Sequence, residues 1–254
     1  MKPKDQKTIL YVALGGVGLY LLSKSQSSAP ASSSDSSSSG PLDFLSTVTS
    51  GITDTIGMAT GSLQSNFVAT MTPIAQAIQA QWGIDPLITI TQAALESAWG
   101  ASGLTKKANN LYGYTGDAAL NTWLSSHGLA SNTPMDQIQA MDLSAAPFII
   151  LQTHEEVSAD PITFFVRPND VVSQSGTDAI ILRPFRRYDS WASSVNDWVQ
   201  LLRNKRYAAA WQDALAGDLQ SFANDIYAGG YATESDYPTQ IVSVGDEVSG
   251  IQTA

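Results

Sequence analysis

Glu96 is a carboxylic acid near the end of a predicted apolar helix, where it could act as a proton donor. Asp85 can cap the start of that helix and Pro86 suits its first turn, because the first amides of a helix have no partner inside it. Apolar or small residues occupy most of the helix, so most of its surface must be buried. These residues are Leu87, Ile88, Ile90, Thr91, Ala94, Leu95 and Ala98. Glu96 is therefore either solvated on an exposed stripe, or buried beside Trp99 with a raised pKa that makes it an acid near neutral pH.

Two further carboxylates, Glu155 and Glu156, lie in a segment with the composition of a strand. Strand candidates separated by Pro, Asn, Asp and Gly occur at residues 148–157, 162–166 and 179–182. They predict a small antiparallel sheet or hairpin. Side chains alternate between the faces of a strand, so Thr153 and Glu155 share one face and Glu156 points to the other.

The residues around Glu96 form two short motifs. Residues 91–102 read TQAALESAWGAS and residues 109–113 read NNLYG. Together they resemble the signature of the glucosaminidases of glycoside hydrolase family 73, found in flagellar muramidases and autolysins, which pairs AQaaLESgWGxS with NNLFG. The chain has Thr91, Ala98 and Tyr112 where that family usually has Ala, Gly and Phe.

Three other segments resemble the same family in the same order along the chain. They are GIDP at residues 83–86, FRRYDS at residues 185–190 and GYATESDY at residues 230–237. The resemblance covers about residues 66–242. It implies an α+β fold that is mainly α, a lysozyme-like helical domain with a small β-hairpin or sheet. Arg187 and its neighbours in the second segment are expected to form structural ion pairs, because that segment leads into a helix, and contact with the substrate is the alternative.

The resemblance also implies a set of site residues. Glu96 is expected to be the general acid. Glu155 stands in the T-x-E of the family, which is proposed to supply the second carboxylate, although a one-residue bulge in the strand would give that role to Glu156. Tyr231 matches a tyrosine that faces the cleft near the catalytic glutamate, where a packed, structural tyrosine is the alternative. The expected substrate-binding residues are Gln92, Trp99, Ser102, Asn110 and Tyr112.

The implied reaction is hydrolysis of the β-1,4 bond between N-acetylglucosamine and N-acetylmuramic acid in the glycan strands of peptidoglycan. One acid protonates the leaving oxygen, and either a second carboxylate or the N-acetyl group of the substrate completes the reaction, so inverting and substrate-assisted routes both remain open. A lytic transglycosylase of the same fold is an alternative, although the GLMQ-type element expected after its glutamate is absent from residues 100–116. An inactive wall-binding or virion structural module is another.

Composition limits the other classes of function. The 254-residue chain has no cysteine, which excludes disulfides and thiolate chemistry, and its two histidines argue against a His-rich metal site, so no cofactor is expected. The net charge of -10 argues against nucleic-acid binding, which needs a basic surface.

The N-terminal part differs in composition from the rest. Residues 8–22 form an uncharged apolar run after three lysines, which predicts a membrane segment or a secretion signal. We favour an uncleaved anchor, with Ala29-Pro30-Ala31 as the cleavage site of the alternative. Residues 25–40 form a serine-rich tether. Residues 41–65 are a stalk helix, a segment that binds a protein partner, or plain linker.

The predicted organisation follows from these segments. It has an N-terminal membrane segment at 1–24, a linker and stalk at 25–65, a catalytic domain at 66–244 and a loose tail at 245–254. This organisation predicts a membrane-anchored protein whose catalytic domain lies on the wall side of a cell-envelope or virion membrane.

Overall fold

The computed structural model describes residues 43–156, 170–175 and 178–253 of the chain. The expected membrane segment at residues 8–22 and the serine-rich tether lie outside these residues. Within the described part, none of the helices has both the length and the apolar character needed to cross a membrane.

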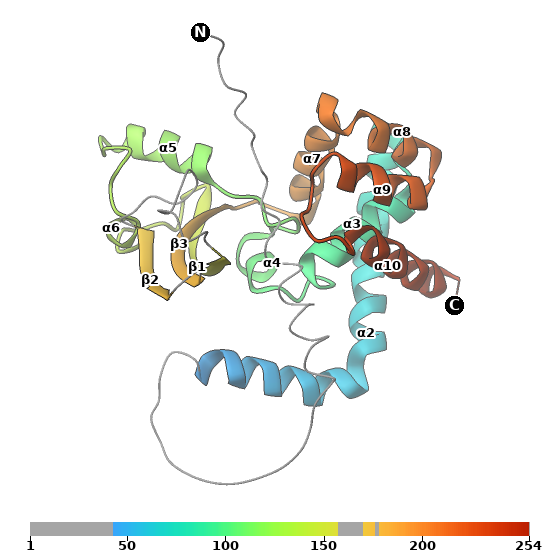
Figure 1. The fold of residues 1–254 in the computed structure, drawn as a ribbon, viewed down its shortest axis with the longest axis horizontal. Helices are drawn as coiled ribbons and strands as arrows, with labels where there is room; N and C mark the ends of the chain where they lie inside the picture. Colours follow the sequence, from blue (N-terminus) through green and yellow to red (C-terminus); the bar gives the residue numbers. More distant parts are fainter. Residues whose placement is uncertain (1–42, 157–169, 176–177, 254) are drawn as a thin grey trace.

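The described elements form a larger helical lobe and a smaller lobe built around a sheet (Figure 1). In the helical lobe are α2 (Asp43–Trp82), α3 (Pro86–Ser97), α7 (Trp191–Leu202), α8 (Ala208–Ala216), α9 (Leu219–Ala228) and α10 (Tyr237–Gln252), with a 3-10 turn at Lys205–Tyr207. In the smaller lobe are α5 (Asp117–Ser126), α6 (Met135–Gln139), β1 (Phe148–Glu156), β2 (Val171–Ser175) and β3 (Asp178–Arg186). The short helix α4 (Gly103–Ala108) lies between the two lobes. The mainly helical α+β fold predicted from the sequence is confirmed.

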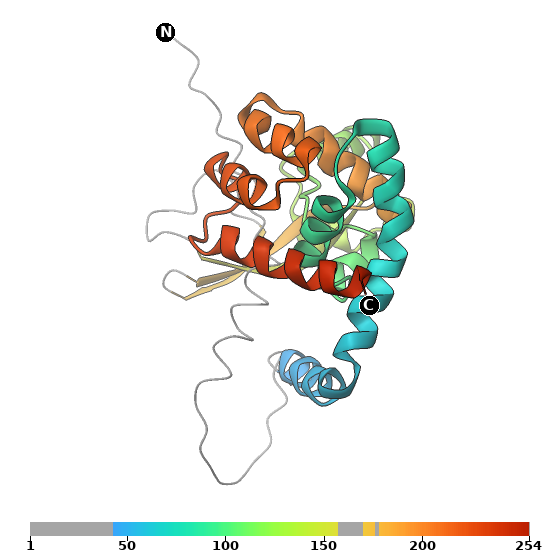
Figure 2. The same cartoon turned by 90° about the vertical axis from the view of Figure 1, so that its right-hand side faces the viewer.

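Helix α3 is the central helix of the larger lobe. Asp85 caps it as expected, since its Oδ1 accepts a hydrogen bond of 2.8 Å from the amide of Leu87. Every residue from Ile88 to Ser97 is buried, because α2 and α10 both pack against this helix (Figure 2). The apolar sequence of α3 is thus explained by contacts on more than one of its faces.

Helix α2 begins at Asp43, within the segment that the sequence assigned to a stalk helix, a partner-binding segment or a linker. Its backbone is helical from Asp43, so most of the 41–65 segment is helical, although the side chains of residues 43–62 lie outside the described part. The helix contains Pro73 and continues through it to Trp82.

The sheet is antiparallel throughout, with strand order β1-β3-β2. This confirms the small sheet expected from the sequence. Strand β2 was not among the predicted strands, and the strand expected at residues 162–166 lies outside the described residues. One face of the sheet packs with α5 and α6 around a second, smaller core. That core contains Leu120, Leu124, Met135, Ile138, Ala146, Phe148, Ile150 and Leu182.

The expectation of a loose tail from residue 245 is wrong, because α10 continues to Gln252. Ile241, Gly245 and Val248 recur at helical spacing and are all buried. A β-carbon on Gly245 would lie 2.2 Å from Cδ2 of Leu219, so the glycine permits close approach of α10 to the start of α9. The last turns of the chain therefore belong to the helical lobe.

Candidate active site

Glu96 is the penultimate residue of α3 and is buried, with 6% of its surface exposed. Its Oε1 accepts two hydrogen bonds, one of 2.9 Å from Nε2 of Gln92 and one of 2.5 Å from the hydroxyl of Tyr237. Burial raises the pKa of Glu96 to about 8, the hydrogen bond from Tyr237 opposes this rise, and the charge of Glu234 adds to it. Glu96 is thus a buried acid that holds its proton near neutral pH, and the solvated reading is wrong.

The chain turns sharply after Glu96. Ala98 and Trp99 both have left-handed backbones, with φ of 50° and 56°, and Gly100 follows at φ 76°. Two successive left-handed residues other than glycine are uncommon and strained. The turn carries the Trp99 ring away from the helix to Phe67, where the two rings meet edge-on at 5.9 Å. Trp99 therefore packs with α2, whereas the sequence predicted that it contacts substrate.

Four buried tyrosines lie around Glu96: Tyr112, Tyr114, Tyr231 and Tyr237. The rings stack in two pairs with centroids 5.9 Å apart, Tyr112 on Tyr114 and Tyr231 on Tyr237. Burial raises the pKa of all four phenols well above 10.0, and the charge of Glu96 adds to each rise. All four hydroxyls therefore remain protonated as hydrogen-bond donors.

Three of these hydroxyls have no hydrogen-bond partner among the described residues. They belong to Tyr112, Tyr114 and Tyr231, and the Oε1 atom of Gln92 is also without one. Buried polar atoms normally have partners, so a cluster of free ones beside a carboxylic acid can receive the polar groups of a ligand. Such groups suit the hydroxyl and amide groups of an amino sugar.

The sequence placed Tyr231 beside the acid but missed Tyr237. Tyr231 does lie in the tyrosine cluster, although its hydroxyl makes no hydrogen bond to Glu96. The contact is made by Tyr237, the first residue of α10 and the second tyrosine of the GYATESDY motif. That motif was the available signal, because it carries two aromatic residues six positions apart.

The other expected binding residues have structural contacts. Ser102 caps α4, accepting a hydrogen bond of 3.0 Å from the amide of Thr105. Asn110 donates to the carbonyls of Tyr114 and Arg186 and so fixes the loop between the lobes. Tyr112 also stacks on the indole of Trp198 at 5.5 Å. Of the five predicted binding residues, Gln92 alone contacts Glu96 directly among the described residues.

For Glu155 and Glu156, the candidates for the second carboxylate, the structure describes the backbone alone. Glu155 pairs with Ala179 and Glu156 with Asp178 at the end of β1, and the side chains of both glutamates lie outside the described part. The pairing of β1 with β3 is regular to its end. The backbone pairing therefore contains no bulge of the kind that would exchange the two glutamates.

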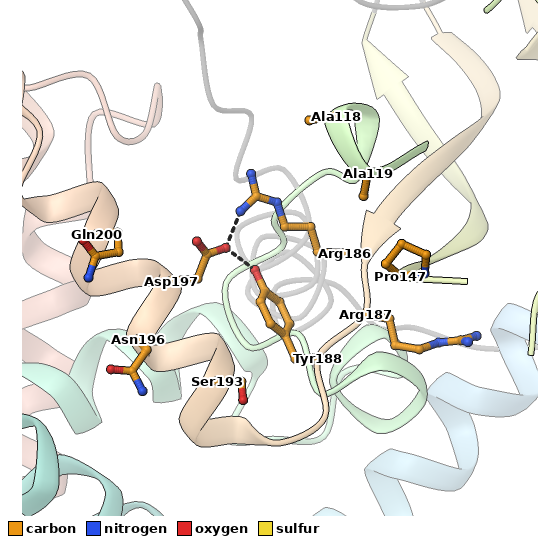
Figure 3. A pocket seen from close by; sticks show the side chains of 10 residues that line it. All are labelled: Ala118, Ala119, Pro147, Arg186, Arg187, Tyr188, Ser193, Asn196, Asp197 and Gln200. Atoms are coloured by element: carbon orange, nitrogen blue, oxygen red, sulfur yellow. Dashed lines mark hydrogen bonds and ion pairs between the residues drawn. The ribbon is translucent and has the colours of Figure 1, made fainter. Parts of the chain in front are cut away.

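A pocket of about 540 Å³ lies between the lobes (Figure 3). It is lined by Ala118, Ala119, Pro147, Arg186, Arg187, Tyr188, Ser193, Asn196, Asp197 and Gln200. Asp197 on α7 pairs with the guanidinium of Arg186 and accepts a hydrogen bond of 2.5 Å from the hydroxyl of Tyr188. Arg186 thus forms a structural ion pair as expected, while Arg187 donates to backbone carbonyls. None of the lining residues has a described hydrogen bond to Glu96.

No metal chemistry is indicated within the ranges that the structure describes, since no group of three or more acidic or histidine side chains there could hold an ion. What the site offers is one buried, protonated carboxylic acid among tyrosine hydroxyls, next to a small sheet in a mainly helical fold. This combination is typical of glycosidases with a lysozyme-like fold, in which a carboxylic acid protonates the leaving oxygen.

The chain belongs to the glucosaminidase family. The family described as mannosyl-glycoprotein endo-beta-N-acetylglucosaminidase matches residues 72–249, which include Glu96 and the whole tyrosine cluster. The family expected from the motifs around Glu96 is therefore confirmed.

Similar proteins include enzymes from several bacteria. The chain is 25% identical over 196 residues to the peptidoglycan hydrolase FlgJ of Vibrio parahaemolyticus, covering 73% of this chain and 48% of FlgJ. It is 26% identical over 187 residues to the exo-glucosaminidase LytG of Bacillus subtilis, covering 71% of this chain and 50% of LytG. The chain thus spans about half the length of these curated relatives.

The fold is shared with a solved structure. The catalytic domain of the autolysin Auto from Listeria monocytogenes superposes with a TM-score of 0.51 at 21% identity, covering 76% of this chain and 88% of that domain. This similarity supports the assignment of the fold.

Proposed function

We propose that the chain is a peptidoglycan hydrolase that cleaves the β-1,4 bond between N-acetylglucosamine and N-acetylmuramic acid, with Glu96 as the general acid. The observation that carries the proposal is the buried Glu96 carboxyl with its pKa raised to about 8, since a proton donor must be protonated at the working pH. The family match and relatives named as peptidoglycan hydrolases support the choice of substrate.

The contacts of Glu96 suit its role before and after proton transfer. The protonated carboxyl gives its proton to the glycosidic oxygen as the bond to the departing N-acetylmuramic acid breaks. Glu96 is then a carboxylate, which the hydroxyl of Tyr237 and the amide of Gln92 stabilise by hydrogen bonds. The unpartnered hydroxyls nearby can receive polar groups of the N-acetylglucosamine unit.

We also propose that residues 8–22 anchor the enzyme in a membrane and that residues 25–40 tether it on the wall side. The apolar run after three lysines supports this, and the helical backbone of α2 from Asp43 suits a stalk or a segment that binds a protein partner. Fractionating cells that express the full chain, beside a variant that lacks residues 1–24, tests the anchor. Recovery of both proteins in the same soluble fraction would contradict it.

The reaction is tested by incubating the full chain and its Glu96→Gln variant with purified peptidoglycan and analysing the fragments by mass spectrometry. The wild type is expected to release fragments with reducing N-acetylglucosamine ends, and Glu96→Gln is expected to lose at least about 10²-fold in rate while still binding the wall. Glutamine keeps the shape and can still accept the hydrogen bond from Tyr237, so the variant should fold.

Other outcomes would assign the protein differently. Anhydromuramic ends would make it a lytic transglycosylase. A wild type that binds the wall without releasing fragments would be a structural module, and full activity of Glu96→Gln would overturn the role of Glu96.

A further inference from the structure

A second carboxylate that the structure describes lies beside the acid site. Glu234 stands in the segment between α9 and α10, and its side chain is exposed. The same segment begins with the buried Tyr231 and leads into the buried Tyr237, which holds Glu96. Glu234 is thus an exposed carboxylate in a segment whose two tyrosines belong to the cluster around the acid.

Local hydrogen bonds hold Glu234 in place. The amide of Thr233 donates to its Oε2 at 3.2 Å, and its backbone carbonyl accepts a bond of 3.1 Å from the amide of Tyr237. The second bond fixes Glu234 one turn before the residue that contacts Glu96. Any movement that displaces Glu234 would therefore also displace Tyr237.

The negative charge of Glu234 acts on Glu96, as expected from its place next to Tyr237 in the chain. The negative charge of Glu234 helps to raise the pKa of Glu96, and no other charged side chain in the described ranges is recorded as doing so. Inverting glycosidases use two carboxyl groups, one as the acid and one as the base that activates a water between them.

We infer that Glu234 is the general base that activates the attacking water, so that the enzyme inverts configuration at the anomeric carbon. This inference rests on the proposed glycosidase function. Water bonds to C1 of N-acetylglucosamine on the face opposite the leaving group and gives one proton to the Glu234 carboxylate. The C1–O bond breaks, its electron pair goes to the leaving oxygen, and that oxygen takes the proton of Glu96.

The inference competes with two other sources of the second group. Glu155 on β1 is the choice that the family motif implies, and the N-acetyl group of the substrate is the other. A base such as Glu234 or Glu155 yields the α-anomer first, whereas assistance by the N-acetyl group yields the β-anomer. Stereochemistry therefore separates the carboxylates from the N-acetyl group, and variants must separate the two carboxylates.

The experiment compares the full-length wild type with Glu234→Gln, Glu155→Gln and Glu234→Asp on soluble peptidoglycan fragments. Glu234→Gln is expected to lose about 10²–10³-fold in kcat with an unchanged circular dichroism spectrum, since general bases contribute about this much. Sodium azide needs no base, so it should restore turnover of Glu234→Gln and give an α-glycosyl azide. Glu234→Asp should keep part of the activity, because it retains a carboxylate.

Asp236→Asn is the matched control. This carboxylate is exposed in the same segment, and its side chain makes no capping hydrogen bond to α10. Its kcat should stay within about twofold of the wild type, with no response to azide. Equal losses in both variants would show that the general charge of the segment matters, which would overturn the role of Glu234.

The outcomes distinguish the inference from the function on which it rests. If the wild type releases reducing N-acetylglucosamine ends as the α-anomer and azide restores Glu234→Gln, the inference holds. Release of the β-anomer first, azide rescue of Glu155→Gln instead, or nearly full activity of Glu234→Gln would overturn it and leave the glycosidase function intact. A wild type that releases no such ends would overturn the function itself.

Discussion

Glu96 illustrates how its surroundings raise the pKa of a glutamic acid until it can donate a proton near neutral pH. Its side chain is chemically the same as that of exposed glutamates in the chain, and burial on α3 is the largest cause of its raised pKa. The groups around it come from three parts of the chain. They are Gln92 on α3, Tyr112 and Tyr114 on the loop after α4, and Tyr231, Glu234 and Tyr237 at or just before the start of α10. The tyrosines stay neutral, and Glu234 supplies the nearby negative charge.

The raised pKa of Glu96 predicts how activity depends on pH. Since the acid must be protonated, kcat/KM should fall above about pH 8, where Glu96 loses its proton. Measuring kcat/KM against pH on soluble glycan fragments tests this alkaline limb of the pH profile. A fall that begins near pH 4.5 would mean that Glu96 is exposed in the working enzyme.

The same group predicts a dependence of stability on pH. The folded protein keeps the Glu96 proton up to about pH 8 and the unfolded chain loses it near 4.5, so the free energy of unfolding should decrease between these values. Glu96→Gln lacks this titration. Its Tm should therefore increase relative to that of the wild type from pH 5 to pH 8, as measured by thermal unfolding, and a constant difference would contradict the burial of Glu96.

Tyr237 is expected to tune the acid. Its hydrogen bond favours the charged form of Glu96, so Tyr237→Phe should raise the pKa of Glu96 and move the alkaline limb upward. The variant also removes one hydrogen-bond donor from the carboxylate that Glu96 becomes after proton transfer. A hydrogen bond to a charged group contributes about 1.5–3 kcal/mol, so kcat should fall about 10- to 100-fold. Tyr227→Phe, in the half-buried part of α9, is the control. An unshifted limb in Tyr237→Phe would show that the hydroxyl does not contact Glu96 in solution.

At the scale of elements, α10 links the end of the chain to the site. Its first residue, Tyr237, contacts Glu96, and its later turns pack against α2, α3 and α9 (Figure 2). Anchoring over sixteen residues keeps the tyrosine at a fixed distance from α3. The last turns of the chain therefore act on the site through the position of one hydroxyl.

Val248 provides a test of this role of α10. The residue is fully buried within the segment that the sequence predicted to be a loose tail. Val248→Ala should lower the free energy of unfolding by about 2 kcal/mol, because it removes two methyl groups and leaves a cavity. Chemical denaturation measures the change, and the exposed Asp246→Ala should change it by less than about 0.5 kcal/mol. Equal, small effects would show that the last turns are not packed.

At the scale of the molecule, the two lobes meet through a few polar contacts beside the inter-lobe pocket. Arg186 ends β3 in the smaller lobe and Asp197 lies on α7 in the larger one, with Tyr188 bonded to the same carboxylate oxygen (Figure 3). The arginine also lies over the ring of Tyr114, at 5.7 Å from its centroid. This contact connects the lobe junction to the tyrosine cluster.

Asp197→Asn should weaken the lobe junction modestly. The side chains of Arg186 and Asp197 are 43% and 27% exposed, so the ion pair contributes at most about 1 kcal/mol, and the hydrogen bond from Tyr188 about another. Thermal unfolding of Asp197→Asn, Tyr188→Phe and the double variant measures both. Their effects should not add, because both contacts use the same oxygen. Strict additivity would show that the two contacts are independent.

Much of the site follows from local sequence. The cap at Asp85, the proline after it and the dense apolar residues define α3 and place Glu96 near its end, because helix starts and buried faces depend on neighbouring residues. The motif around Glu96 indicated the family, and segments with the composition of strands, separated by turn residues, indicated the sheet.

Tertiary structure decided the state of Glu96 and its partner. Tyr237 lies 141 positions from Glu96, and no local pattern chooses between it and Tyr231, since both tyrosines stand in one motif. The helical end of α10 and strand β2 also depended on partners distant in sequence, against which weakly patterned segments become ordered. The raised pKa of Glu96 arises from burial, which is a property of the packed lobe and of no single segment.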